Sequence, residues 1–283
     1  MGNNRASLYG MSTGSNGGDS YTGPLDLVPG AVVAYGVRAL SAAWLGESIF
    51  RLRRDSDDAE LDFEADAVTG EAPVATINTW LGAGDGFLVT FYDQSGNGHD
   101  LTRSSAAFQP AFVASLVGGK CGFTETREAN AEFDAVSIPF PNGAYSGLSV
   151  CTFGRDTVGS FFHFEQSDPS ASWDADFDQA ADQFLLATDG TNSAGGIVST
   201  AIQAQSAVDF GFQFGTRTLY VNGVALGIDG SLDVDGAVGA FTADIFNNLM
   251  GGGFCEALIY NTLVSPATRE PGRTNQMTEY TLS

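Results

Sequence analysis

The chain has 283 residues, 43% of them hydrophobic, which is enough to build the core of one large domain. Asp and Glu number 34 against 12 Lys and Arg, so the formal net charge is −22. A surface of this sign repels nucleic acid and anionic lipid, and no apolar stretch is long enough to cross a bilayer. We therefore expect no nucleic acid and no membrane among the partners.

Residues 1–24 are predicted to form a flexible N-terminal arm, because they are rich in Gly, Ser, Asn and Thr and lack hydrophobic periodicity. The arm either stays flexible or becomes ordered on a neighbouring subunit. Residues 1–18 carry one Arg and no apolar core, so the sequence shows no secretion signal. Residues 25–283 contain no linker and no internal repeat, and are predicted to form a single domain.

The first predicted element of the domain is a short amphipathic helix that ends near Gly46. Its apolar positions recur at helical spacing: Val33, Val37, Leu40 and Trp44. On this helix, Arg38 is expected to be solvated, with pairing to an acidic neighbour as the alternative. A strand with one exposed face is predicted at 49–53, and the acidic stretch at 55–66 is expected to be a solvated loop.

A second short helix is predicted between Pro73, which suits the first turn of a helix, and Gly82, which suits its end. Ile77 and Leu81 then lie on one face of this helix. Because both predicted helices are short, we expect them at the periphery of the fold.

The chain is organised around a polar turn that follows a predicted strand at 87–91. The turn reads Tyr-Asp-Gln-Ser-Gly-Asn-Gly-His over residues 92–99. Asp and Asn side chains can hydrogen-bond nearby backbone groups, and glycines permit the positive φ angles of tight turns. A lone histidine beside such a turn is expected to pack or hydrogen-bond rather than act as a base. The turn is predicted to be a structural brace or a ligand contact made by Tyr92, Asp93, Gln94, Asn97 and His99.

Three spaced motifs lie at residues 35–40 (Tyr-Gly-Val-Arg-Ala-Leu), 49–58 (Ile-Phe-Arg-Leu-Arg-Arg-Asp-Ser-Asp-Asp) and 92–98. In this order they resemble the signature of the catalytic-domain superfamily of fungal α-L-arabinofuranosidase B. The resemblance implies a concanavalin A-like jelly roll related to laminin G modules, a fold that also occurs in bacteriophage virion proteins. It covers residues 31–115 and bears on fold more than on activity, because one fold hosts many functions.

Beyond residue 115, helical spacing disappears and short alternating or aromatic segments take over, as in all-β domains. Strands are predicted at 149–153, 160–165, 184–187, 208–214, 218–221, 224–226 and 254–260. The Asn-Gly pair at 222–223 predicts a tight hairpin, and residues 218–224 resemble the matching hairpin of laminin G modules. The prediction is therefore an all-β fold, a concanavalin A-like jelly-roll β-sandwich with two short peripheral helices.

A retaining glycosidase needs two carboxyl groups about 5 Å apart, one as nucleophile and one as acid and base. The resemblance implies a nucleophile within an Asn-Ala-Glu-Thr type segment, and the matching string here is Asn-Ala-Glu-Phe at 130–133. Glu132 is therefore the candidate nucleophile, with a surface carboxylate as the alternative. The adjacent cysteine pair of that family is absent, and Cys121, Cys151 and Cys255 are expected to be buried thiols.

Asp174, Asp176 and Asp178 alternate, so a strand would place them on one face, where carboxylate oxygens could hold Ca²⁺. The stretch lacks the glycine and the distal glutamate of an EF-hand. Apart from this calcium hypothesis, we expect no cofactor. His163 lies in an aromatic segment and is expected to pack rather than to catalyse.

Together these features favour a bacteriophage virion structural protein, such as a tail, fibre or capsid-decoration component, located in the virion. Such a protein would associate with other virion subunits as a homo-oligomer, and its lectin-like fold could bind a surface polysaccharide. An enzyme is the less favoured interpretation, because the nucleophile segment departs from the family pattern. The alternative is a glycoside hydrolase of the α-L-arabinofuranosidase type.

Overall fold

The strands of the protein form two antiparallel sheets. The computed structural model describes residues 20–124, 136–140, 145–152, 158–166, 172–178, 183–188, 196–198, 206–213, 216–229, 239–245 and 252–282. Twelve of the described strands make the larger sheet: β1 (Val33–Gly36), β2 (Ser48–Arg54), β3 (Glu60–Glu64), β4 (Gly86–Phe91), β5 (Leu101–Thr102), β6 (Ala111–Val117), β7 (Lys120–Thr124), β9 (Tyr145–Thr152), β14 (Ser206–Gln213), β15 (Thr216–Val221), β16 (Val224–Asp229) and β18 (Gly253–Tyr260). Six make the smaller sheet: β8 (Val136–Phe140), β10 (Val158–Gln166), β11 (Ser172–Asp178), β12 (Gln183–Thr188), β13 (Gly196–Val198) and β17 (Gly239–Ile245).

Short helices accompany the two sheets in the described ranges. They are α1 (Pro24–Leu27), α2 (Val74–Leu81), α3 (Pro266–Glu279), and the 3₁₀ turns η1 (Ala42–Trp44) and η2 (Ala106–Phe108). Within the part of the chain that the structure describes, no helix combines the length and the apolar character that crossing a membrane requires.

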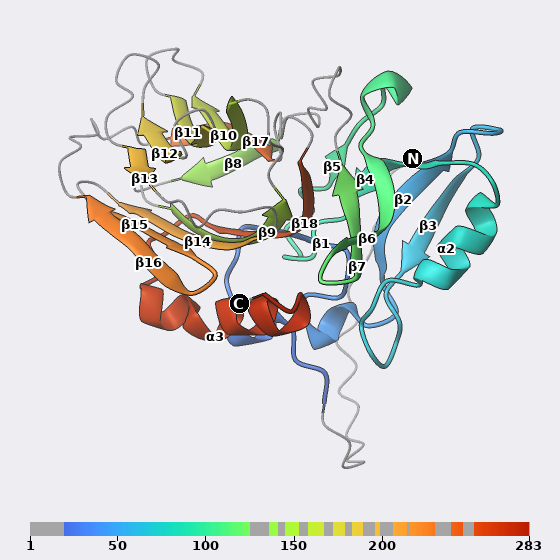
Figure 1. The fold of residues 1–283 in the computed structure, drawn as a ribbon, viewed down its shortest axis with the longest axis horizontal. Helices are drawn as coiled ribbons and strands as arrows, with labels where there is room; N and C mark the ends of the chain where they lie inside the picture. Colours follow the sequence, from blue (N-terminus) through green and yellow to red (C-terminus); the bar gives the residue numbers. More distant parts are fainter. Residues whose placement is uncertain are drawn as a thin grey trace.

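The larger sheet runs in the spatial order β16-β15-β14-β9-β18-β7-β6-β4-β2-β3, with β1 beside β18 and β5 beside β4. Figure 1 shows the smaller sheet facing the half of the larger sheet that contains β9 and β14–β16, while α3 lies against the opposite side of that half. The strands β2–β4, β6 and β7 extend the larger sheet sideways, and α2 lies beside them. The predicted all-β sandwich is therefore confirmed.

The core lies around β18, an inner strand of the larger sheet. Every residue of β18 is buried, and on one side it pairs with β9. Rings of the core pack at angles, as between Phe50 and Phe123, whose centroids lie 5.3 Å apart at 88°, and between Phe91 and Phe123, at 5.6 Å and 69°. Such edge-to-face packing adds about 0.5–1.5 kcal/mol per pair beyond the burial of apolar area.

The helix predicted around residues 33–44 is wrong. Residues Val33–Gly36 form β1, which is buried along its whole length and pairs antiparallel with β18, Val33 opposite Ile259. The apolar residues at 31–35 form an unbroken run, which suits a strand that is buried on both faces, and pairing with β18 satisfies its buried backbone groups. Only the three-residue turn η1 is helical in this region.

Other local predictions have mixed outcomes. The second helix is confirmed as α2, with Ile77 and Leu81 buried and Gly82 at φ 65° closing it. The Asn-Gly hairpin is confirmed by positive φ angles at 222 and 223 and by pairing of Val221 with Val224. The prediction of a solvated loop at 55–66 is wrong, because this stretch contains β3, an edge strand of the larger sheet. Helix α3 was not predicted.

The predicted strands beyond residue 145 overlap β9, β10, β12, β14, β15, β16 and β18, and are confirmed. The predicted N-terminal arm at residues 1–24 falls almost wholly outside the described residues, which begin at Ser20. At its end, Tyr21 is packed against the domain, where its hydroxyl donates to the carbonyl of Ala39.

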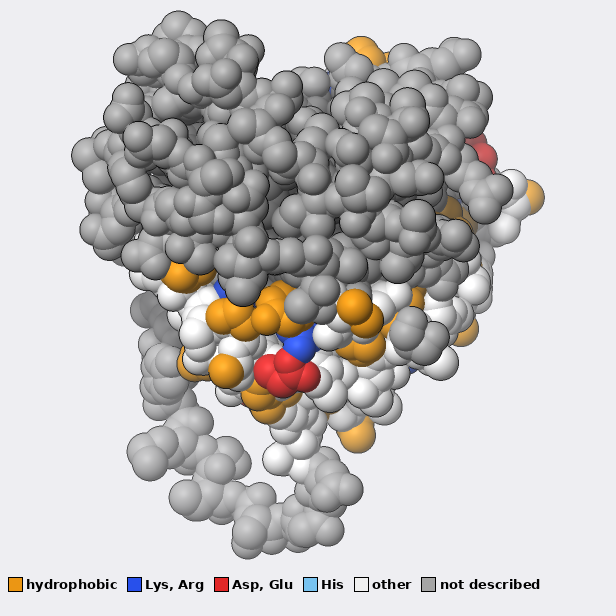
Figure 2. All heavy atoms as spheres, turned by 60° about the vertical axis from the view of Figure 1, so that its left-hand side comes forward, with side chains coloured by type: hydrophobic (Ala, Val, Ile, Leu, Met, Phe, Trp, Pro, Cys, Tyr) orange, Lys and Arg blue, Asp and Glu red, His pale blue; other side chains and the backbone are white. Residues whose placement is uncertain are grey.

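The acidic surplus of the chain is not concentrated on the described part of the face in Figure 2. There, hydrophobic side chains, in orange, surround one small group of acidic and basic side chains. Large apolar side chains that are exposed in the described ranges include Val68 at 79% and Val224 at 61%. Isolated exposed apolar residues are normal on soluble domains, so this face alone defines no site.

Candidate functional site

The polar turn that follows β4 is a brace between β4 and β1. The Asp93 carboxylate is buried and accepts hydrogen bonds from the backbone N–H groups of Ala34 (2.9 Å), Ser95 (2.9 Å) and His99 (3.1 Å). The carboxylate also accepts a hydrogen bond from the Ser95 hydroxyl at 2.8 Å. One carboxylate thus organises the turn and ties it to the neighbouring strand.

Gln94 and Asn97 extend the same brace. The Gln94 amide donates to the carbonyls of Gly36 (3.1 Å) and Arg38 (2.9 Å), and its oxygen accepts from the N–H of Leu40 (2.8 Å). The Asn97 amide donates to the carbonyl of Val32 at 2.9 Å. Because Asp93 and Gln94 are buried and fully engaged, neither side chain is open to a ligand.

His99 contributes its backbone to the brace, since its carbonyl accepts a hydrogen bond of 2.5 Å from the buried Tyr35 hydroxyl. Tyr92 instead points toward the outer edge of the sheet. Its hydroxyl donates to Asp62 Oδ1 at 2.6 Å, and burial together with Asp62 raises the pKa of Tyr92 to about 12. Among the five residues predicted for this site, Tyr92 is therefore the one that reaches another candidate site.

That second site is a groove beside β3. The β3 groove has a volume of 330 Å³ and is lined by Gly46, Leu61, Asp62, Phe63, Glu64, Ala65, Ala67, Pro73 and Thr76. Arg51 holds Asp62 in a two-pronged contact, Nε to Oδ1 at 2.8 Å and Nη2 to Oδ2 at 2.9 Å. A carboxylate that is fixed in this way can accept hydrogen bonds from hydroxyl groups, and the volume falls in the range of roughly 300–1,000 Å³ typical of ligand pockets.

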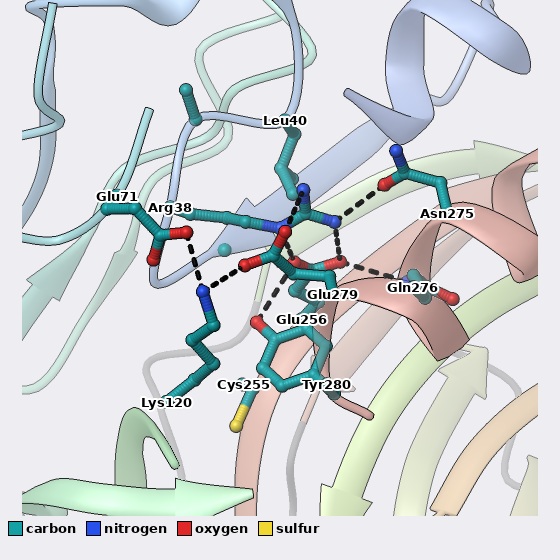
Figure 3. Close-up of polar contacts among 12 residues, drawn as sticks. Arg38, Leu40, Glu71, Lys120, Cys255, Glu256, Asn275, Gln276, Glu279 and Tyr280 are labelled. Atoms are coloured by element: carbon teal, nitrogen blue, oxygen red, sulfur yellow. Dashed lines mark hydrogen bonds and ion pairs between the residues drawn. The ribbon is translucent and has the colours of Figure 1, made fainter. Parts of the chain in front are cut away.

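A third polar cluster ties α3 to the larger sheet (Figure 3). At its centre, Arg38 and Glu256 form an ion pair whose side chains are only 4% and 0% exposed. Glu256 also accepts from the Tyr280 hydroxyl (2.9 Å) and the Gln276 amide (3.1 Å), both carried at or just after the end of α3. The prediction that Arg38 is solvated is wrong, because its partner comes from the far end of the chain.

At the edge of this cluster, Lys120 lies between two carboxylates. Its Nζ is 2.6 Å from Glu71 Oε1 and 2.6 Å from Glu279 Oε1. With Arg38 and Tyr280 they line a pocket of 110 Å³. We call Arg38, Glu71, Lys120, Glu256, Glu279 and Tyr280 the α3 clamp. Glu71 and Glu279 lie close together, but the pocket is smaller than ligand pockets usually are, and both of these carboxylates are held by Lys120.

The side chains of the other residues predicted as sites lie outside the part of the chain that the structure describes. Glu132 lies outside the described residues. Asp174, Asp176 and Asp178 lie on β11, but their side chains are outside the described set, as is that of His163 on β10. Among described residues, no group of three or more His, Cys, Asp or Glu side chains is arranged to hold a metal ion. The calcium hypothesis stays a prediction.

Asp62 and Glu256 were not predicted as site residues. The alternation of Glu60, Asp62 and Glu64 was the available signal for β3, because period-two spacing marks a strand. Glu256 had no local signal, since a carboxylate within an apolar strand identifies no partner. The three cysteines are buried thiols, as predicted.

Comparison with known proteins identifies relatives of the N-terminal half. Residues 28–138 match the family model described as Alpha-L-arabinofuranosidase B, catalytic. This segment contains β1–β7, the brace and the β3 groove. No curated protein sequence matches the chain.

Solved structures share the fold over 92% of the chain. One is a mutant GH54 α-L-arabinofuranosidase soaked with 4-nitrophenyl α-L-arabinofuranoside, with a TM-score of 0.69, 14% identity and 66% of that chain covered. Another is a GH54 α-L-arabinofuranosidase soaked with a cyclic sulfate inhibitor, with a TM-score of 0.70, 14% identity and 66% covered. A third is an arabinofuranosidase complexed with arabinofuranosyl-α-1,2-xylobiose, with a TM-score of 0.70, 14% identity and 65% covered.

The chain is thus a β-sandwich domain related in fold to these arabinofuranosidases, and it spans about two thirds of their length. The favoured hypothesis of a virion structural protein is wrong, because the family model and the structural relatives favour a glycoside hydrolase. The virion role was inferred from the same family resemblance, which fits the alternative, a glycoside hydrolase, better.

Proposed function

We propose that this domain is a glycoside hydrolase of the α-L-arabinofuranosidase type. The observation that carries the proposal is the match of residues 28–138 to the catalytic-domain model. The shared fold over 92% of the chain supports it. The substrate class would be a polysaccharide or oligosaccharide that bears terminal arabinofuranosyl groups.

The proposed reaction needs a nucleophile and an acid and base, both carboxyl groups. Glu132 is the proposed nucleophile, because it follows Asn-Ala as in the family segment. Glu125 lies in the same stretch but follows threonine, so it serves as a matched control. We do not assign Glu71 and Glu279 of the α3 clamp as the catalytic pair, because Lys120 lies between their carboxylates.

The test is release of 4-nitrophenol from 4-nitrophenyl α-L-arabinofuranoside by the purified chain. We expect turnover that Glu132→Gln abolishes and Glu125→Gln retains. Turnover that survives Glu132→Gln would reject Glu132 but keep the activity. No turnover with arabinofuranosides, by a folded protein, would reject the proposed function.

The β3 groove favours a second function, binding of a glycan without hydrolysis. The Asp62 carboxylate lines this groove and is held in place by Arg51, which lies outside the lining, so it offers fixed acceptors to a ligand. Calorimetric titration with arabino-oligosaccharides should give binding that Asp62→Asn weakens. Asp57→Asn is the control, because Asp57 pairs with Arg54 at 2.7 Å but lies outside the groove. Equal binding by both variants would rule out the groove.

A further inference from the structure

Strand β3 forms one edge of the larger sheet. Among the described strands it pairs with β2 alone, with Asp62 opposite Arg51. Figure 1 shows β3 as the last strand on that side of the sheet, with α2 beside it. An edge strand carries a row of backbone N–H and C=O groups that can pair with a further strand. The outer side of β3 is therefore a place where another segment can extend the sheet.

The backbone hydrogen bonds at the two ends of β3 show which of its residues face outward. The carbonyl of Ala59 accepts from the N–H of Arg54 in β2 at 2.8 Å. The N–H of Ala65 donates to the carbonyl of Glu47, which precedes β2, at 2.9 Å. Backbone groups of successive residues in a strand point to opposite edges. Those of the even-numbered residues of β3 therefore point to the outer edge.

The β3 groove follows this outer edge. Its lining includes the consecutive residues 61–64, and the side chains of consecutive strand residues lie on opposite faces of a sheet. A hollow that touches all of them runs along the edge of the strand rather than over one face. Pro73 and Thr76, at the beginning of α2, also line it, and Leu61 is 41% exposed. The groove thus has room for an extended segment beside β3.

The charges at this edge favour a basic segment. Glu60, Asp62 and Glu64 alternate along β3 and share one face. Glu60 and Asp62 contact Arg51 at 3.8 and 2.8 Å, whereas Glu64 is exposed and has no ion-pair partner among the described residues. A second copy of the chain would bring the same carboxylates to the edge, and like charges directly opposite one another destabilise strand pairing. A basic segment avoids this repulsion.

We propose that β3 binds an extended basic peptide of a partner protein, which pairs antiparallel with its outer edge and adds a strand to the larger sheet. Peptide residues opposite Glu60 and Glu64 are Lys or Arg, because opposite residues of paired strands share a face. The residues between them are apolar and contact Leu61 and Pro73. Backbone hydrogen bonds supply affinity in this mode of binding, and alternate side chains supply specificity. The interaction does not depend on the proposed hydrolase activity.

The test uses a fluorescein-labelled peptide of alternating Lys and Val with blocked ends, whose binding to the full chain is measured by fluorescence anisotropy. Two further peptides carry N-methyl groups on every Lys or on every Val, so that charge, side chains and number of methyl groups are matched. In antiparallel pairing, the Lys residues opposite Glu60 and Glu64 direct their N–H groups to β3. We expect methylation of Lys to weaken binding at least about tenfold, and methylation of Val to change it less than about twofold.

Variants of the protein test the charge of the edge. Glu64→Gln should weaken binding about two- to fivefold, the effect of one cross-strand charge pair. The control is Asp85→Asn, which removes the same charge from an exposed side chain outside the groove and should bind like wild type. Binding should also slow hydrogen exchange in fragments that cover residues 60–64, because the added strand protects their outward N–H groups.

Equal affinity of the two methylated peptides would overturn the proposal, because the groove would then recognise side chains alone. The proposal also fails if the unmodified peptide does not bind the folded chain. In that case, sedimentation of the chain as a dimer would point to a second copy as the occupant of the edge. Binding of arabino-oligosaccharides that Asp62→Asn weakens would instead assign the groove to a glycan.

Discussion

Replacement of Asp93 by alanine should destabilise the domain more than any other change in the brace. The carboxylate accepts from three backbone N–H groups, those of Ala34, Ser95 and His99, and is itself buried. Each buried donor left without an acceptor costs about 1–3 kcal/mol. Water that enters the space left by the carboxylate can accept from some of these donors, which offsets part of the cost. We therefore expect Asp93→Ala to lower the free energy of unfolding by about 3–5 kcal/mol.

Urea denaturation followed by circular dichroism measures this loss, with an unchanged dependence on denaturant showing that the unfolding transition is the same. Asn97→Ala is the comparison, because the exposed Asn97 amide also bonds the backbone of the brace, donating to the Val32 carbonyl at 2.9 Å. It should cost about 0.5–1.5 kcal/mol. A loss below about 1 kcal/mol for Asp93→Ala would refute the view that its carboxylate holds the turn together.

Other changes test the clamp, a close contact and the metal hypothesis. Arg38→Met should cost about 3–5 kcal/mol because it leaves buried Glu256 without a counter-charge, and adding Glu256→Gln should restore part of the loss in urea unfolding. In Gly118→Ala, the new Cβ would lie 1.9 Å from the carbonyl oxygen of Tyr280, and residue 118 has a φ of +55°, so we expect a loss of stability of more than about 2 kcal/mol. In Gly119→Ala, the new Cβ meets nothing within 4 Å, and the loss should be about 1 kcal/mol. If the aspartates of β11 hold Ca²⁺, added calcium should raise the melting temperature, and EDTA or Asp176→Asn should abolish the rise; a melting temperature that calcium leaves unchanged would reject the calcium hypothesis.

The strands were predictable where their signals were local. The hairpin at 222–223 and the closing strand β18 follow from an Asn-Gly pair and from an apolar segment of strand length. The error at β1 arose because Val33 and Val37 happen to be four residues apart. Four-residue spacing cannot distinguish a helix from a strand buried on both faces, and only the partner β18 resolves the two.

The polar contacts were not predictable, for two physical reasons. Arg38 and Glu256 are 218 positions apart, so nothing near either residue in the sequence indicates the ion pair. Helix α3 buries Arg269 and Gln276, and a helix that docks through polar groups lacks the apolar periodicity by which helices are recognised. The brace was different, since the residue types of the turn at 92–99 already indicated hydrogen bonds to the backbone.

The pairing of β1 with β18 also governs when the protein can fold. During synthesis, the segment at 28–138 leaves the ribosome long before β18 exists, so β1 has no partner strand and Arg38 no counter-charge. Contacts of such high sequence separation form slowly, and the unpaired edges remain open to other chains meanwhile. We expect folding to finish only after β18 has left the ribosome, and a chain that stops before residue 253 to aggregate rather than to yield a smaller domain.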